Sequence, residues 1–229
     1  MVKVVKGPLG GWGVCSRTIQ LGECTRALSH HNNHVAVGSL SGDINILNAV
    51  TGSQSVVLSG HTGEVNCIVF SSDGTSLVSG SDDKTIKLWD IQTGGVIKTF
   101  FGHTGEVYSV SISVDCTTIA SGSGDQTICL WVIQTGECYH TIQQQGWVSH
   151  VGFSSKDPQH LISVCDYMVW QWDVNGCQIR PPFNGYYIAF SSDGAWFVSC
   201  CCQGHSHPKL SAPLRGSNRP LLASTELAW

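Results

Sequence analysis

Apolar and polar residues alternate along much of the chain, and short polar turns interrupt the alternation. Val65, Cys67 and Val69 alternate with polar or smaller residues, and the segment Ser71 to Gly74 that follows has the composition of a hairpin turn. No stretch sustains a period of 3.6 residues, so we expect strands and almost no helix. Three further strands are expected in the same unit: Ser76 to Gly80, Thr85 to Trp89 and Val96 to Phe100.

The chain repeats this four-strand unit. Residues 60–94 and 102–136 match position by position at an offset of 42. A weaker copy at 34–52 has the same offset, another follows downstream at an offset of 41, and 188–199 resembles 68–79 before the match stops. Four short antiparallel strands in each unit are the pattern of one blade of a β-propeller, in which neighbouring units bury a common core.

Several defined residues recur at fixed places in the two clearest units. The first unit contains Gly60-His61, Ser79-Gly80-Ser81, Asp83 and Trp89-Asp90, and the second repeats the pattern with Val132 in place of the final Asp. These residues resemble the signature of the WD-repeat family of β-propellers. The segments SGHTGEV and FSSDGTSLVSGSDDKTIKLWDIQTG are also similar to the WD-repeat arrays of fungal NACHT-type signalling NTPases.

The resemblance implies an all-β fold, a partial or small WD-repeat propeller with four recognisable blades and part of a fifth. We expect an N-terminal segment at 1–14, the propeller at 15–202 and a disordered or loosely attached tail at 203–229. The abrupt change after residue 202 suggests a truncated gene model, a frame change or a spliced variant. The expected blades cover about 15–58, 59–101, 102–144, 145–182 and, in part, 183–202.

In the family, four residues of a blade form a hydrogen-bonded set, and a buried Asp needs the donors that His, Ser and Trp supply. The first unit lacks these residues, and in the fourth Gln144 falls at the His position. Carried over, the sets are His61, Ser79, Asp83 and Trp89; His103, Ser121, Asp125 and Trp131; and Ser163, Asp166 and Trp172.

Two patterns resemble enzyme sites. A Ser, a His and an Asp also make a hydrolase triad, but here the trio occurs twice at the repeat spacing and no GxSxG elbow is present. Cys200 to Cys202, His205 and His207 resemble metal ligands, although their spacing is not that of a zinc finger. We therefore expect no catalytic residue, metal or cofactor. A metal-binding or hydrolytic enzyme using this Cys/His stretch is the disfavoured alternative.

The remaining candidates are recognition residues, since propellers present partners with side chains at the mouth of the central channel. By resemblance, the residues expected there are Glu64, Asn66, Asp82, Glu106, Tyr108, Gly124, Trp147, Ser149 and Cys165. Tyr108 and Trp147 are the favoured anchors, because aromatic residues often dominate binding energy. The alternative interpretation is ordinary surface variation.

Composition narrows the partner class. The net charge is −4, only 12% of the residues are charged, and no basic block occurs, so no nucleic-acid partner is expected. No apolar run is long enough for a membrane span. The 11 cysteines include no CxxC pair, and with no apolar leader they favour a cytoplasmic location.

The function predicted from the sequence is a non-catalytic scaffold that binds a peptide or protein segment on the propeller face, as the recognition part of a larger signalling protein. A truncated propeller fragment with no independent function is an alternative. An unclosed propeller exposes strand edges, so we also expect a larger assembly, self-association through those edges or poor solubility.

Overall fold

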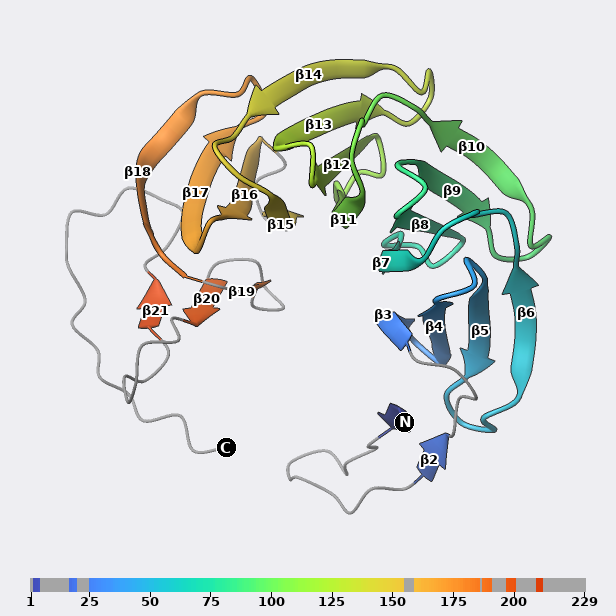
Figure 1. Cartoon of the computed structure of the whole chain (residues 1–229). Coiled ribbons are helices and arrows are strands. Elements are labelled where there is room, and N and C mark those ends of the chain that lie inside the picture. Colours follow the sequence, from blue (N-terminus) through green and yellow to red (C-terminus); the bar gives the residue numbers. More distant parts are fainter. Residues whose placement is uncertain are drawn as a thin grey trace.

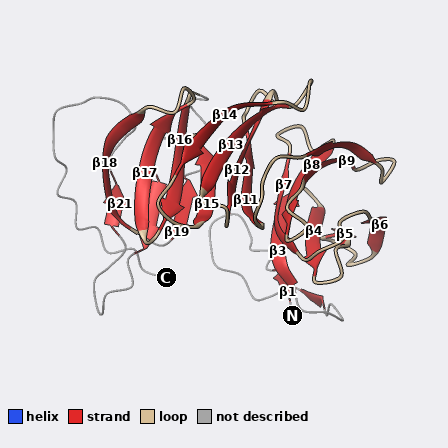
Figure 2. Ribbon diagram, turned by 45° about the horizontal axis from the view of Figure 1, so that its top comes forward, coloured by secondary structure: helices blue, strands red, loops and turns tan. Residues whose placement is uncertain are grey.

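Four antiparallel sheets of four strands each follow one another in a curved array in the computed structural model (Figure 1). The structure describes residues 2–4, 17–19, 25–154, 159–185, 187–190, 197–200 and 209–211, and the side chains of 26–154 and 159–185. The described residues form strands, turns and loops, and none is helical (Figure 2). The all-β expectation is therefore confirmed.

Strand order within each sheet follows the chain. The first sheet contains β3 (Thr25–His31), β4 (His34–Ser39), β5 (Ile44–Asn48) and β6 (Gln54–Leu58). The second contains β7 (Val65–Phe70), β8 (Ser76–Ser81), β9 (Ile86–Asp90) and β10 (Val96–Phe100). The third contains β11 (Val107–Ile112), β12 (Thr118–Ser123), β13 (Thr127–Val132) and β14 (Cys138–Gln143). The fourth contains β15 (Val148–Phe153), β16 (His160–Cys165), β17 (Met168–Asp173) and β18 (Gln178–Asn184).

Two smaller sheets lie at the ends of the array (Figure 1). They consist of β1 (Val2–Val4) with β2 (Arg17–Ile19), and of β19 (Tyr187–Phe190), β20 (Phe197–Cys200) and β21 (Lys209–Ser211). Because β21 pairs with β20, strand pairing extends into the segment 203–229, which was expected to form the tail. The fourth sheet likewise runs to Asn184, past the expected end at 182.

The first strand of each four-stranded sheet lies on the inside of the curve and the last lies on the outside (Figure 1). The core is divided between neighbouring sheets rather than enclosed by one. Phe100 of the second sheet, for example, packs in one buried cluster with Ile119 and Trp131 of the third. Each sheet therefore depends on its neighbours for burial, as in repeat proteins generally.

A glycine in the second strand lets successive sheets approach closely. A Cβ atom at Gly80 would lie 2.5 Å from Val107 Cγ1 in the next sheet, and one at Gly122 would lie equally close to Val148 Cγ1. Val164 occupies the corresponding place in the fourth sheet, where it joins a separate apolar cluster. The Ser-Gly of the repeat thus has a packing role between sheets.

Every inner strand contains a bulge near its start. The pairing register skips one residue of the inner strand in each of the four sheets. A bulge leaves its extra residue outside the ladder and redirects the side chain. The four extra residues are Arg26, Asn66, Tyr108 and Ser149.

Candidate functional site

A buried chain of hydrogen bonds crosses the second sheet. His61 lies in the loop before β7, and its Nδ1 is 2.7 Å from Asp83 Oδ2 in the turn between β8 and β9. Its Nε2 is 2.7 Å from Ser79 Oγ on β8. Trp89 Nε1 on β9 donates to the same hydroxyl at 2.8 Å. The structure therefore brings together the four residues that the repeat signature indicates. We call this arrangement the Asp–His–Ser–Trp network.

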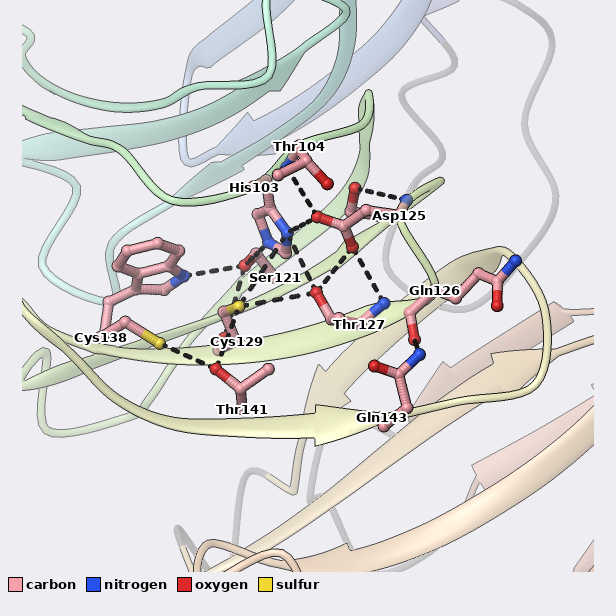
Figure 3. A network of polar contacts seen from close by, with 12 residues as sticks. His103, Thr104, Ser121, Asp125, Gln126, Thr127, Cys129, Cys138, Thr141 and Gln143 are labelled. Carbon is pink, nitrogen blue, oxygen red and sulfur yellow. Dashed lines mark hydrogen bonds and ion pairs between the residues drawn. The ribbon is translucent and has the colours of Figure 1, made fainter.

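The third sheet contains the same network. His103 Nδ1 is 2.8 Å from Asp125 Oδ2, its Nε2 is 2.7 Å from Ser121 Oγ, and Trp131 Nε1 donates to that hydroxyl at 2.8 Å. Figure 3 shows His103 between the serine and the aspartate. Thr127 and the backbone of Thr104 also donate to the carboxylate. The network thus ties the loop before the inner strand to the next turn of the sheet.

The two carboxylates are ionised members of these networks. Burial alone would raise the pKa of Asp83, but hydrogen bonds from His61 and Thr85 outweigh it and hold the pKa below the usual range. The same balance, with Thr127 as the strongest donor, lowers the pKa of Asp125 to about 2. Donors that favour the charged form account for both shifts.

The networks do not offer a nucleophile to a substrate. Ser79 is 0% exposed, and its hydroxyl oxygen is already bonded to both His61 Nε2 and Trp89 Nε1. Ser121 is equally buried beneath Trp131. A hydrolase serine must reach a substrate carbonyl, so the arrangement acts in the structure as an internal brace.

A further polar group extends the third network outward. Cys129 on β13 and Cys138 on β14 both contact the Thr141 hydroxyl, with sulfur–oxygen distances of 3.7 Å and 3.5 Å (Figure 3). The hydrogen bond between the two thiols raises the pKa of Cys129 and lowers that of Cys138 to about 6. The second sheet has Lys87 and Val96 at these places, so this pair is specific to the third.

The fourth sheet keeps only part of the network. Trp172 Nε1 donates to Ser163 Oγ at 2.9 Å. Asp166, however, is exposed in a two-residue turn with Tyr167, and both residues have positive φ (48° and 63°). This turn is one residue shorter than the turn of the third sheet, which moves Asp166 out of the Asp125 position. The expected place of Asp166 in the network is therefore corrected.

The first sheet has a serine bond in the corresponding turn instead. Ser39 Oγ and Ser41 Oγ lie 2.7 Å apart, and Leu47 occupies the tryptophan position as a buried apolar residue. The sheet still has the same strand order and the same bulge as the others. The expectation that the first unit lacks the network agrees with these contacts.

The predicted recognition residues of the second sheet form a connected set. Glu64 Oε1 lies 2.7 Å from Nε of Arg26, the bulge residue of the first sheet. Asn66 Nδ2 donates to Asp82 Oδ1 at 2.7 Å and to the Val107 carbonyl at 3.2 Å. These contacts join the bulges of neighbouring sheets to the turn at Asp82. Arg26 was not among the predicted residues.

The third and fourth sheets continue this surface with aromatic side chains. The ring centroids of Tyr108 and Trp147 are 6.3 Å apart with a 45° tilt, and Trp147 is 65% exposed. A Cβ atom at Gly124 would lie 3.2 Å from Tyr108 Cε2 and 3.0 Å from Glu106 Oε2, so both side chains lie against this glycine. We call the whole set the bulge face: Arg26, Glu64, Asn66, Asp82, Glu106, Tyr108, Gly124 and Trp147.

Two predicted recognition residues differ in their surroundings. Ser149 is exposed at the bulge of β15. Cys165 is only 3% exposed at the end of β16, where its register partner is Val148, so it cannot make a partner contact. The short turn also explains the burial of Cys165. Counted from the bulge, Cys165 corresponds to the buried Ser123 of the third sheet, and Asp166 corresponds to Gly124. The Asp166 carboxylate lies against Gly146, next to Trp147 in the chain.

Most of the Cys/His stretch lies outside the described residues. Cys200 ends β20, whereas Cys201, Cys202, His205 and His207 lie outside the described residues. Among the residues whose side chains are described, no group of three or more His, Cys, Asp or Glu side chains could hold a metal ion. None of the described residues belongs to a helix long and apolar enough to cross a membrane.

Comparison with known families identifies the repeats. Residues 52–90 and 94–132 match the family model described as WD domain, G-beta repeat. These two segments of the chain therefore match WD40 repeats. With the four-stranded sheets, these matches make the fold a partial WD40 β-propeller, and the sequence-based prediction of the fold is confirmed.

The similar curated proteins match the chain over short segments. The chain is 37% identical over 65 residues to Protein ROOT INITIATION DEFECTIVE 3 of Arabidopsis thaliana, which covers 28% of this chain and 15% of that protein. It is 45% identical over 58 residues to Periodic tryptophan protein 2 of Saccharomyces cerevisiae, covering 25% and 6%. Serine-threonine kinase receptor-associated protein of Dictyostelium discoideum is 40% identical over 63 residues, covering 28% and 22%. The matched segments thus span less than a quarter of each relative.

Proposed function

We propose that this chain is a non-catalytic scaffold that binds a peptide or protein segment on the bulge face. The observation that carries the proposal is the exposed Trp147 indole packed beside Tyr108, the bulge residue of β11. The complete network of the third sheet fastens the loop before β11. Aromatic side chains of this kind dominate the binding energy of many interfaces. WD40 proteins generally bind protein partners, which supports this class of ligand.

The finer parts of the proposal rest on the resemblance. A role as the recognition part of a larger signalling protein, of the fungal NACHT type, is supported by the similarity of the repeat segments. A cytoplasmic location is supported by the cysteine pattern. The rejection of a nucleic-acid partner is supported by the net charge of −4 and the absence of a basic block.

A peptide library tests the scaffold function directly. Immobilised chain is panned against displayed random peptides, and the affinity of each enriched peptide is then measured for the wild-type and Trp147→Ala proteins. We expect enriched peptides whose affinity falls about tenfold or more in Trp147→Ala, because the anchor is lost. Tyr139→Ala serves as the control, since Tyr139 is a half-exposed aromatic residue on the outer strand β14. Enriched peptides that bind Trp147→Ala and wild type equally would contradict the proposal.

The alternative of a fragment without independent function is tested by the solution mass. Size exclusion with light scattering gives the mass of the purified chain, and thermal melting gives its cooperativity. A discrete monomer or dimer with a cooperative transition supports an independently folding scaffold. Aggregates without a transition would favour the fragment, because unburied sheet faces and free strand edges associate.

A further inference from the structure

The aromatic pair of the bulge face forms an open wall between two sheets. Tyr108 is the extra residue of the β11 bulge, and Trp147 precedes β15 in the next sheet. Their centroids are 6.3 Å apart, and the indole remains 65% exposed. A side chain already packed against a second ring loses little freedom when it binds, so this wall is organised in advance for a ligand.

Carboxylates surround the wall. Glu106 shares the surface of Gly124 with Tyr108. Burial and the charges of Glu106 and Asp82 raise the pKa of Tyr108, and Arg26 lowers it. Both carboxylates therefore lie close enough to act on the ring.

A third carboxylate lies on the side of the tryptophan. A Cβ atom at Gly146 would overlap the carboxylate of Asp166, so this acid lies against the residue that precedes Trp147. Acidic groups thus lie beside Tyr108 and beside the residue that precedes Trp147. Asp82 lies in the turn between β8 and β9, Glu106 in the loop before β11 and Asp166 in the turn between β16 and β17. The acidic surface is therefore built by three sheets rather than by one acidic segment.

Arg26, a basic group near the wall, is already engaged in an ion pair. Arg26 Nε is 2.7 Å from Glu64 Oε1, so this pair contributes little net charge. Asp82 receives its hydrogen bond from the neutral amide of Asn66, which leaves its charge in place. The surface around Tyr108 and Trp147 therefore has a negative potential that an incoming cation would balance.

We propose that the wall of Tyr108 and Trp147 receives a lysine or arginine side chain of a protein partner, whose charge faces Glu106, Asp82 and Asp166. This inference rests on the proposed function and specifies its ligand chemistry. Aromatic faces attract cations, and carboxylates bind guanidinium and ammonium groups through charge-assisted hydrogen bonds. An acidic peptide or a phosphate backbone would meet repulsion at the same place.

Matched peptides test the charge requirement. Three fluorescein-labelled peptides share a Gly-Ser backbone and carry arginine, citrulline or glutamate at the same positions, so citrulline provides the uncharged isostere of arginine. Binding is followed by fluorescence anisotropy at low and high salt. We expect the arginine peptide to bind about tenfold more tightly than the citrulline peptide, and we expect this advantage to shrink in high salt.

Variants then assign the effect to the surface. Trp147→Ala should weaken the arginine peptide about tenfold. Glu106→Gln and Asp166→Asn should each weaken it severalfold while leaving citrulline binding unchanged. Tyr139→Ala on β14 is the control for a lost aromatic group elsewhere. Circular dichroism and melting confirm that each variant is folded, which is expected because the changed side chains are partly or largely exposed.

The outcomes distinguish failure of the cation site from failure of the peptide-binding scaffold function. Equal binding of arginine and citrulline peptides, with both weakened by Trp147→Ala, would overturn the cation site and leave the peptide-binding scaffold standing. Failure of the arginine peptide to bind folded protein would also overturn the cation site. The scaffold function itself fails only if the peptide library also yields no binder that depends on Trp147.

Discussion

The second and third sheets contain a complete Asp–His–Ser–Trp network, whereas the fourth sheet does not. This difference shows which interactions form a sheet and which fasten its loops. In the second and third sheets, the network joins the loop before the inner strand to the following turn. The fourth keeps only the Ser163–Trp172 bond, yet it has four strands, the same order and the same bulge. Strand alternation and apolar packing therefore make the sheet, whereas the network fastens the loop that precedes it.

Removing the tryptophan of a complete network should have the largest effect. Trp89→Ala deletes a fully buried indole between the first and second sheets and leaves Ser79 without its donor. We expect a loss of about 3–5 kcal/mol in the free energy of unfolding, measured by urea denaturation. If this variant does not fold, Trp89→Phe keeps an aromatic ring in the core and removes the Nε1 donor to Ser79, so its stability loss reports mainly on that hydrogen bond. Trp147→Ala, at an exposed site, is the control, and a similar loss there would contradict this assignment of the core.

The serines sharpen the contrast between complete and partial networks. Ser79→Ala leaves both His61 Nε2 and Trp89 Nε1 without their partner, whereas Ser163→Ala leaves only the Trp172 donor. Since each unsatisfied buried group costs about 1–3 kcal/mol, we expect a loss of about 2–6 kcal/mol for the first and about half of that for the second. Equal losses in urea denaturation would show that the histidine contributes nothing to stability.

Acid should weaken the complete networks selectively. The pKa of Asp125 is about 2 in the folded chain against an ordinary value of 3.8, so the unfolded chain takes up the proton first as the pH falls. The stabilisation is therefore fully present above about pH 4 and is lost between about pH 4 and pH 2. Urea denaturation across this range should show that the difference in unfolding free energy between wild type and Asp125→Asn becomes smaller as the pH falls.

The fourth sheet supplies the control for this pH effect. Trp172→Phe removes the Ser163 bond without touching a carboxylate, so its cost should stay constant across the same pH range. A cost that shrinks in parallel with that of Asp125→Asn would show that a general acid expansion, and not the network carboxylate, governs the response.

The repeat offset predicted the fold because it is a consequence of the packing. Gly80 and Gly122 recur since each must admit a valine of the next sheet, and the network residues recur because they bond to one another. The strand Val96–Phe100 was also predicted to the residue, from the turn at Thr93 to Gly95 that precedes it. Positions fixed by repeated contacts are therefore visible in the sequence.

Length changes in turns were the source of the errors. The two-residue turn at Asp166 and Tyr167 shifts the fourth sheet by one position, which placed Asp166 in a network and Cys165 on the surface. In the first sheet, a short turn at Asn32 brings the inner strand to an offset of 40, so Arg26 escaped notice. An alignment of bulge to bulge, with a free turn length, would have found it. The sequence does not mark the bulges themselves, because the extra residue is of a different type in each sheet.

The bulges have a consequence for how such a surface can change over generations. A residue that makes no ladder pair can be exchanged without shifting the alternation of the strand that carries it. Positions 26, 66, 108 and 149 already hold a cation, an amide, a phenol and a hydroxyl. Natural or laboratory selection can therefore change the ligand specificity of this surface by substituting one residue in each sheet, while the strand pairing stays the same.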